Sequence, residues 1–283
     1  MMAMEKNEAG RKICVITGGS SGIGFATAMR MGKKGYAVVL AARTPSKLEQ
    51  AITALKAEDI EAFACPCDIS NWASVKALAR YAQSLGEVTA VMHIAGVSPH
   101  MGDAEKIMRG NALGTAHIHD AFYPVLASGG CLIDTSSMSA YLAPSLIMPK
   151  RAFRLAAADR ERFLKKMMAR VNLLPRGSRA GAAYAISKYF VIQYAKMEAA
   201  RFGEKGVRVL SITPGNFETP MGKLEQEEAQ TYLKFNAIRR VGRPDEIAAL
   251  FAAVSDPEMG YLTGTDIICD GGCVAGGAGP FSR

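Results

Sequence analysis

The sequence predicts a single α/β domain built on a doubly wound parallel sheet, and three observations support that fold class. Apolar, β-branched runs alternate with helical patterns along most of the 283 residues. The first apolar run, 13–16, leads through the glycine-rich segment 17–24 directly into a helical pattern. No internal repeat or low-complexity linker divides the chain, whose length suits one large α/β domain. We therefore expect one domain over residues 1–283.

The elements are expected in strict alternation. Strands are predicted at 13–16, 36–42, 60–65, 88–94, 131–135, 207–212 and 266–269. Helices are predicted at 25–31, 46–57, 70–85, 103–126 and 182–202. Parallel strands connected by helices bury both faces of the sheet, and a ligand binds beyond the carboxyl ends of such strands.

The segment Thr17-Gly18-Gly19-Ser20-Ser21-Gly22-Ile23-Gly24 predicts a site for a dinucleotide diphosphate. A strand that turns tightly into a helix presents free N–H groups and the positive end of the helix dipole. The first glycine allows the turn, the second lets the backbone approach the ligand, and the third lets helix and strand pack closely. We expect contacts from Gly18, Ser20, Ser21, Gly22, Ile23 and Gly24. The alternative is a glycine-rich turn that binds nothing.

Three later strand ends extend this site. Arg43 closes the second strand where an acidic residue would bind the ribose 2′-hydroxyl, and a guanidinium there favours a 2′-phosphate. The expected cofactor is therefore NADP(H) in preference to NAD(H), although a solvated surface arginine is the alternative. Asp68, with Ile69 after it, follows the third strand and can reach the adenine. Ala95 and Gly96 follow the fourth strand, where small residues let the cofactor approach.

Tyr184 and Lys188 are the candidates for proton transfer. Residues four apart on a helix share a face, and Tyr184 alone among the nine tyrosines has a lysine four positions later. A neighbouring ammonium is expected to lower the tyrosine pKa from about 10, so that the hydroxyl can exchange a proton with a carbinol oxygen. Such pairs are common on helix surfaces, but this one follows a strand that ends in Ser136-Ser137.

With these motifs in order, the sequence resembles the short-chain dehydrogenase/reductase family over nearly its whole length. The resemblance implies a Rossmann-type sheet and assigns catalytic roles to Asn111, Ser137, Tyr184 and Lys188. It also gives Tyr184 and Lys188 a part in cofactor binding. Nicotinamide contacts are implied for the segment 214–219, through Pro214, Gly215, Phe217 and Thr219, and Asp270-Gly271-Gly272 matches a C-terminal family motif.

The sequence departs from the family in two places. The usual Asn-Asn-Ala-Gly at the end of strand four reads His93-Ile94-Ala95-Gly96, which affects how this strand braces the cofactor. The spacing between Ser137 and Tyr184 is also much longer than usual, which suggests a helical insert at about 139–180. Bacterial 3α-hydroxysteroid dehydrogenases of the family carry a similar insertion over the substrate cleft. We therefore expect one helix, about 150–171, over the cleft, with its stripe of Phe163, Met167 and Val171 facing the sheet or the substrate.

The insert carries the charge of the protein. It contains ten basic residues and only Asp159 and Glu161 as acidic ones, a balance of +8 that equals the net charge of the whole chain. The basic residues are Lys150, Arg151, Arg154, Arg160, Arg162, Lys165, Lys166, Arg170, Arg176 and Arg179. They either attract an anionic group of the substrate or merely solvate the helix. Nucleic acid is not expected as a partner, because no aromatic stacking pattern accompanies the charges.

Composition indicates a cytoplasmic location. No apolar run is long enough to span a bilayer, and the polar start Met1–Arg11 is not a secretion signal but a frayed tail. The six cysteines are expected to be reduced, and the four histidines lack metal-ligand spacing, so no metal is expected.

The motifs together predict an NADP(H)-dependent alcohol dehydrogenase or carbonyl reductase for a bulky apolar alcohol or ketone, such as a hydroxysteroid or bile acid. The resemblance implies a homo-oligomer, a dimer or tetramer that associates through the two long helices, unless the insert changes that contact. The alternative enzyme is a 3-oxoacyl-carrier-protein reductase, whose acidic partner would suit the basic insert. The alternative of another class is a non-catalytic dinucleotide sensor, which the intact Asn111, Ser137, Tyr184 and Lys188 set disfavours.

Overall fold

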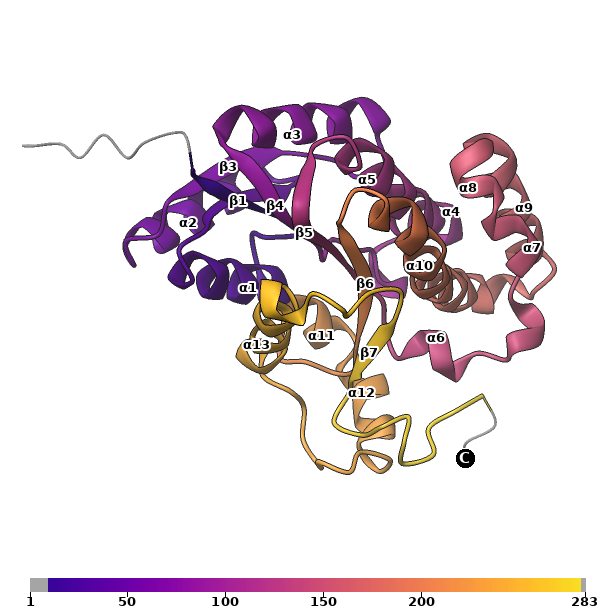
Figure 1. The fold of residues 1–283 in the computed structure, drawn as a ribbon. Coiled ribbons are helices and arrows are strands. Elements are labelled where there is room, and N and C mark those ends of the chain that lie inside the picture. The colour runs from indigo at the N-terminus through magenta and orange to yellow at the C-terminus, as the bar shows by residue number, and fades with distance from the viewer. Residues whose placement is uncertain (1–9, 281–283) are drawn as a thin grey trace, which may run out of the picture.

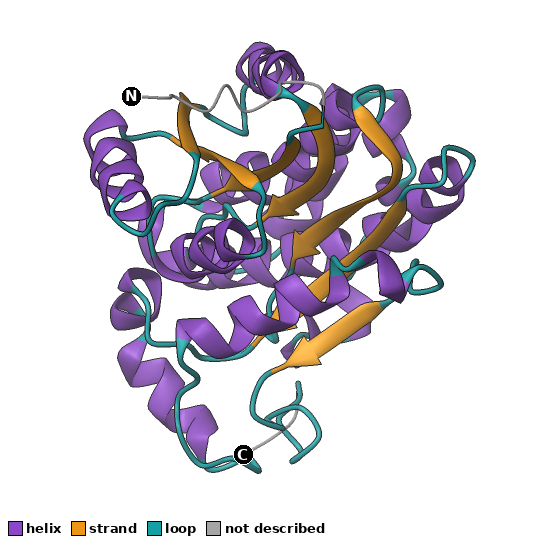
Figure 2. Ribbon diagram, turned by 60° about the vertical axis from the view of Figure 1, so that its left-hand side comes forward, coloured by secondary structure: helices purple, strands orange, loops and turns teal. Residues whose placement is uncertain are grey.

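The computed structural model describes residues 10–280, with only the backbone described at Glu228. Seven parallel strands form one sheet in the order β3-β2-β1-β4-β5-β6-β7, and helices cover both faces of it (Figures 1 and 2). The strands are β1 (Lys12–Thr17), β2 (Ala37–Ala42), β3 (Ala62–Pro66), β4 (Glu87–His93), β5 (Leu126–Thr135), β6 (Arg208–Pro214) and β7 (Asp266–Cys269). The predicted doubly wound parallel sheet is confirmed.

The structure contains long helices and shorter helical segments. The long ones are α1 (Gly22–Lys33), α2 (Pro45–Lys56), α3 (Trp72–Leu85), α5 (Gly114–Phe122), α9 (Arg160–Asn172), α10 (Arg179–Gly203), α12 (Gln226–Leu233) and α13 (Pro244–Val254). The shorter helical segments are α4 (Ala104–Ile107), the π-helical η2 (Met108–Leu113), α6 (Ser139–Leu142), α7 (Lys150–Phe153), α8 (Leu155–Ala158) and α11 (Pro220–Leu224). Helices α3, α5 and α10 pack on one face of the sheet, and α1, α2 and α13 pack on the other.

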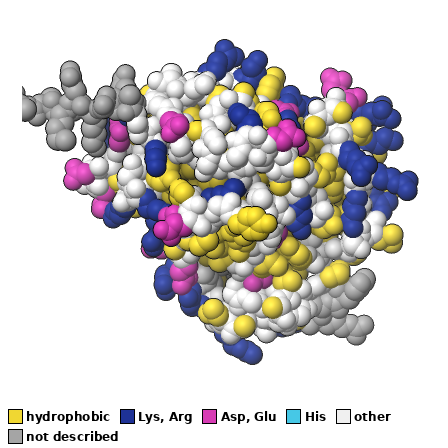
Figure 3. Space-filling model, viewed as in Figure 1, with side chains coloured by type: hydrophobic (Ala, Val, Ile, Leu, Met, Phe, Trp, Pro, Cys, Tyr) yellow, Lys and Arg dark blue, Asp and Glu magenta, His cyan; other side chains and the backbone are white. Residues whose placement is uncertain are grey.

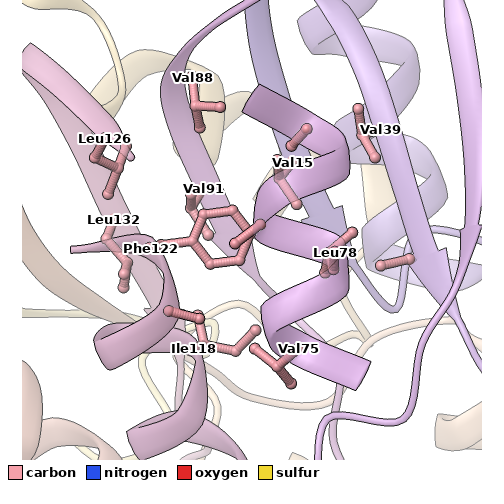
Figure 4. Close-up of a cluster of buried hydrophobic side chains, with 14 of the residues drawn as sticks. Val15, Val39, Val75, Leu78, Val88, Val91, Ile118, Phe122, Leu126 and Leu132 are labelled. Carbon is pink, nitrogen blue, oxygen red and sulfur yellow. The ribbon is translucent and has the colours of Figure 1, made fainter. Parts of the chain in front are cut away.

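The core follows from strands that are apolar on both sides. β1 buries every residue after Lys12, as expected for a strand covered on both faces. On the α3–α5–α10 face, Val15, Val91 and Leu132 of neighbouring strands meet Phe122 of α5 and Leu78 of α3 (Figure 4). This packing holds the strands in place relative to one another, and so positions the loops at their carboxyl ends.

Two predicted elements differ from the structure. The helix expected at 103–126 is interrupted by η2, and β5 already begins at Leu126, where it pairs with Val88 of β4. The pattern of apolar residues continues through η2, so it could not reveal that the backbone hydrogen bonds there span five residues, as in a π-helix, instead of four. Helix α13, which packs against α1, was not predicted from the sequence.

The stretch 150–171, expected as one helix, folds as three: α7, α8 and α9. Asp159 separates α8 from α9, because its side chain accepts a hydrogen bond from the Arg162 backbone N–H at 2.9 Å and so starts a new helix. The stripe of Phe163, Met167 and Val171 is fully buried, as the periodicity predicts. It packs against α10, where the rings of Phe163 and Phe190 lie 4.8 Å apart.

The expectation that this helix lies over the cleft, with its stripe facing the sheet or substrate, is wrong. The stripe belongs to a cluster formed with α4, η2 and the outer side of α10, which already cover the sheet there. Figure 1 shows α7, α8 and α9 beyond α10, on the side away from β7. The apolar stripe showed that the helix packs against something, but not which surface it packs against.

The described residues also bear on the expectations from composition. All six cysteines are unpaired thiols. Within 10–280, no helix combines the length and hydropathy needed to cross a membrane, and no cluster of side chains is arranged to hold a metal ion. The tail expected over Met1–Arg11 lies outside the described residues except for its last two.

Candidate active site

A pocket of about 650 Å³ lies at the carboxyl ends of the strands, where this fold binds ligands. Its lining comes from the segments after β1 to β6 and from one face of α10. The pocket brings together all the residues expected to bind cofactor: Gly18, Ser20, Ser21, Gly22, Ile23, Gly24, Arg43, Asp68, Ile69, Ala95, Gly96, Tyr184, Lys188, Pro214, Gly215, Phe217 and Thr219. Ser137 also lines it, whereas Asn111 is buried behind the lining.

The loop after β1 has the shape that a diphosphate requires. Gly18 has a φ of +69°, and a Cβ there would lie 3.0 Å from the Ala95 backbone. A Cβ on Gly24 would collide with the carbonyl oxygen of Gly18. Because α1 begins at Gly22, its unpaired N–H groups and positive dipole end lie at the pocket. These residues therefore fit a dinucleotide.

Two cations lie where the 2′-phosphate of a dinucleotide is expected. Arg43 and Lys47 are both exposed at the pocket edge, and neither forms an ion pair with another described residue. Lys47 was missed in the sequence, although its position four residues after Arg43, in the first turn of α2, was an available signal. Asp68 also lines this end, where its Oδ1 accepts hydrogen bonds from the Ser70 N–H at 2.9 Å and the Ser70 hydroxyl at 2.7 Å.

Ser137, Tyr184 and Lys188 meet at the other end of the pocket. The Lys188 ammonium donates to the Thr135 carbonyl at 2.8 Å, and the Ser136 hydroxyl donates to the Lys188 carbonyl at 2.8 Å. These bonds join the end of β5 to α10 on either side of the catalytic candidates. The Lys188 ammonium lies 5.8 Å from the centre of the Tyr184 ring, and the Ser137 hydroxyl donates to the Ser139 hydroxyl at 3.3 Å.

The pKa of Tyr184 differs from the sequence expectation. Burial raises it above the usual phenol value, the Glu225 carboxylate raises it further, and the hydrogen bond with Ser137 lowers it in part. The expected lowering by Lys188 is therefore wrong for the protein without ligand. Burial also lowers the pKa of Lys188 to about 8, although the carboxylates of Asp134 and Glu225 oppose this change. At neutral pH the site holds a protonated phenol beside an ammonium group.

Asn111 lies in η2 and braces the segment that follows β4. Its side chain accepts from the Val97 N–H at 2.7 Å and donates to the Val97 carbonyl at 2.9 Å. It also donates to the Ser187 hydroxyl at 3.2 Å, on the helix that carries Tyr184. Asn111 therefore ties the wall of the pocket to α10.

The pocket lining also includes apolar and charged side chains outside the predicted motifs. The apolar ones include Val97, Met101, Met138 and Met221, and the charged ones include Asp103, Glu105, Lys106, Arg109 and Glu225. The effect of Glu225 on both Tyr184 and Lys188 places it near the reacting groups. These residues were missed in the sequence, because none of them belongs to a recognised motif and their place at the pocket depends on long-range packing.

Comparison with known proteins bears directly on this arrangement. Residues 12–148 match the family model described as short chain dehydrogenase, and residues 170–274 match one described as enoyl-(acyl carrier protein) reductase. The short-chain dehydrogenase/reductase bsc3 of Alternaria brassicicola is 33% identical over 265 residues, which cover 91% of this chain and 94% of the relative. The chain belongs to the short-chain dehydrogenase/reductase family. It is therefore an oxidoreductase, of a family that uses NAD(P).

More distant members agree in length and fold. A cyclohexanol dehydrogenase from an Acinetobacter strain is 23% identical, with 95% of this chain and 98% of the relative covered. A short chain dehydrogenase from Burkholderia cenocepacia, solved in complex with NADP, superposes with a TM-score of 0.74 at 23% identity, covering 95% of this chain and all of the other. Residues 149–169, which include most of the insert helices, lie between the two matched family models.

Proposed function

We propose that this short-chain dehydrogenase/reductase is an NADP(H)-dependent alcohol dehydrogenase or carbonyl reductase. The observation that carries the proposal is the pocket that joins Ser137, Tyr184 and Lys188 to the glycine loop and to Arg43. A non-catalytic sensor would need the loop but not a hydroxyl, a phenol and an ammonium group brought together at the other end.

The proposed mechanism assigns one role to each side chain. The bound nicotinamide supplies or accepts the hydride. In reduction, Tyr184 donates its proton to the substrate oxygen, and Ser137 donates a hydrogen bond that stabilises the negative charge on it. Lys188 binds the cofactor ribose and holds positive charge beside Tyr184. Asn111 holds the pocket wall and supports the return of protons through water.

The proposed preference for NADP(H) rests on Arg43 and Lys47. Both cations lie at the end of the pocket where a 2′-phosphate would bind, and no carboxylate ion pair occupies either of them among the described residues. NAD(H) lacks that phosphate, so it would bind at the same loop without these two contacts. It remains a usable but weaker cofactor in this proposal.

We propose a bulky, apolar, uncharged alcohol or ketone as substrate, with a neutral hydroxysteroid as the first compound to test. The methionine-rich wall suits a large apolar ring system, because thioether side chains adapt to irregular shapes. The relative named cyclohexanol dehydrogenase supports a cyclic alcohol.

A substrate panel tests the proposal. NADPH oxidation, followed by its absorbance, is measured with neutral ketosteroids, matched keto bile acids, cyclohexanone and 3-oxoacyl thioesters, and the reverse reaction with the alcohols. Neutral ketosteroids should give the highest kcat/KM. If no carbonyl compound is turned over while NADPH still binds, the sensor is the better description of the protein.

One observation favours the 3-oxoacyl-carrier-protein reductase as second candidate. Arg151, Arg154, Arg162, Lys165, Lys166 and Arg176 are exposed on the insert and form no ion pair within the described chain. Figure 3 shows Lys and Arg side chains gathered over α8 and α9. An acidic carrier protein would complement this surface. Preference for an acyl group on carrier protein over the same acyl group on a small thiol would favour this candidate.

The remaining proposals concern assembly and location. We propose a homo-oligomer, a dimer or a tetramer, that does not associate through the covered face of α4 and α10. A cytoplasmic location is also proposed, which the six unpaired thiols support.

A further inference from the structure

The most unusual residue near the site is His93, which stands where family members have asparagine. It ends β4, is 3% exposed, and pairs in register with Thr17 of β1 on one side and Asp134 of β5 on the other. Its ring lies in a layer of polar side chains beneath α5, where Thr115 faces it. None of the catalytic roles above uses this imidazole.

The hydrogen bonds around His93 determine which ring nitrogen carries the proton. The Thr17 hydroxyl oxygen accepts from the backbone N–H groups of Ile94 and Ala95, each at 3.1 Å. Its single hydrogen is therefore available for Nδ1 of His93, 2.9 Å away, which must be an acceptor. The Thr115 hydroxyl gives its hydrogen to the Asn111 carbonyl at 2.7 Å, so it accepts from Nε2 of His93 at 3.2 Å. The ring is neutral with the proton on Nε2.

This chain of hydrogen bonds connects two parts of the site that lie on different elements. Thr17 is the last residue before Gly18, and the bonds from Ile94 and Ala95 hold the end of β4 against it. The fit there is close, because a Cβ on Gly18 would lie 3.0 Å from Ala95. At the other end, Thr115 bonds the carbonyl of Asn111, whose side chain braces Val97. A rotated Thr17 hydroxyl would release the loop from β4.

We propose that His93, as a neutral imidazole with its proton on Nε2, is a positioning residue that holds the dinucleotide-binding loop in its binding-competent form through Thr17. It does not touch the cofactor. The proposal rests on the proposed function only in requiring that the loop binds a dinucleotide. An asparagine offers one acceptor and one donor at this place, so it can serve both partners, whereas a protonated imidazole has no acceptor for Thr17.

The surroundings of His93 favour the neutral form. Burial, helped by the nearby Lys188 and His119 and opposed by the Asp134 carboxylate, lowers the pKa of His93 to about 4. These are the charged and titratable groups that face the ring from α10, α5 and β5. The acceptor role at Nδ1 is therefore maintained down to about pH 5.

The first test is ¹⁵N NMR of the histidine-labelled protein without cofactor. At pH 7 we expect a neutral His93 with its proton on Nε2, identified by the loss of its signals in His93→Asn, and a titration near pH 4. A ring protonated on Nδ1, or charged at pH 7, would overturn the proposal. This readout does not depend on turnover.

The second test measures NADPH affinity by fluorescence titration. His93→Leu should bind about ten-fold more weakly, the size expected for one lost hydrogen bond in the loop, while His93→Asn should stay within about three-fold of the wild type. The same affinity for His93→Leu as for the wild type, or equal losses in both variants, would overturn the proposal. If the wild type binds NADPH but the variants give either contradicting result, only the proposed role of His93 is refuted and the proposed function stands. If the wild type does not bind NADPH, the role of His93 and the proposed function are both refuted.

Two variants with nearly the same shape keep the test valid if His93→Leu fails to fold. Thr115→Val removes the oxygen that accepts from Nε2 but keeps the volume, and Thr115→Ser keeps the oxygen. The proposal expects weaker NADPH binding by Thr115→Val and near wild-type binding by Thr115→Ser. Equal affinities of the two variants would contradict the proposal, because the hydrogen bond from Nε2 of His93 to residue 115 would then not matter for NADPH binding.

Discussion

The protonation states of Tyr184 and Lys188 bear on whether the proposed reaction runs as reduction or oxidation. Without ligand, burial keeps the phenol of Tyr184 protonated, and the nearby Lys188 retains its ammonium charge up to about pH 8. A protonated phenol can donate a proton but cannot accept one, which suits the proposed role of Tyr184 in carbonyl reduction. Oxidation of an alcohol requires Tyr184 to lose this proton first.

The pH dependence of reduction follows from Lys188. Its pKa in the folded protein, about 8, lies below the usual value, so the ammonium is present below pH 8 and is lost as pH rises above it. We expect kcat/KM for reduction to fall above about pH 8, because kcat/KM reports groups of the free enzyme. Lys188→Met should be weak at every pH, and Lys196→Met, an exposed control on α10, should keep the wild-type profile. A flat wild-type profile from pH 6 to 10 would contradict this assignment.

Arg43 and Lys47 should determine the preference between the two cofactors. A charge-assisted hydrogen bond to the 2′-phosphate contributes about 1.5–3 kcal/mol, or roughly ten- to a hundred-fold. Arg43→Ala should therefore remove most of the preference for NADPH over NADH, and Lys47→Ala a smaller part. Lys56→Ala, at the far end of α2, is the matched control. The two cofactors are compared by kcat/KM, and equal values in the wild type would refute the preference.

At the scale of elements, the structure shows what the sequence could and could not determine. The strands that end at Thr17 and shortly before Arg43 and Ser137 were predictable, because buried parallel strands are continuous apolar runs. The glycine loop and the spacing of Tyr184 and Lys188 were predictable because local geometry alone requires them. By contrast, Met221 of α11 and Glu225, which follows this helix, reach the pocket through long-range packing, and η2 keeps the apolar pattern of an ordinary helix.

The packing of α9 against α10 can be tested by its effect on stability. Met167 of α9 is fully buried against α10, so Met167→Ala should lower the free energy of unfolding by about 2–5 kcal/mol in urea titrations. Lys166→Ala, on the exposed side of α9, should change it by less than about 0.5 kcal/mol. KM for a neutral substrate should stay unchanged in both, since among the described residues none from 140 to 183 lines the pocket. A large change of KM in Met167→Ala with little loss of stability would instead indicate a lid.

The whole molecule combines a nearly neutral catalytic body with a basic insert. Six exposed cations of the insert lie on the outer side of helices that cover α4 and α10, so a second copy placed there would face like charges. We expect light scattering after size exclusion to give the same mass for Lys165→Glu/Lys166→Glu as for the wild type. A change of mass in this variant would place the subunit contact on the insert.

The most direct test of the account is Tyr184→Phe, which removes one oxygen and keeps the ring. Proton donors of this kind contribute roughly 10²–10⁴-fold to turnover. We predict that kcat for the best ketone falls by at least 10²-fold in this variant, while NADPH affinity, measured by fluorescence titration, stays within a few-fold of the wild type. A variant that keeps more than about a tenth of wild-type kcat would show that Tyr184 is not the proton donor.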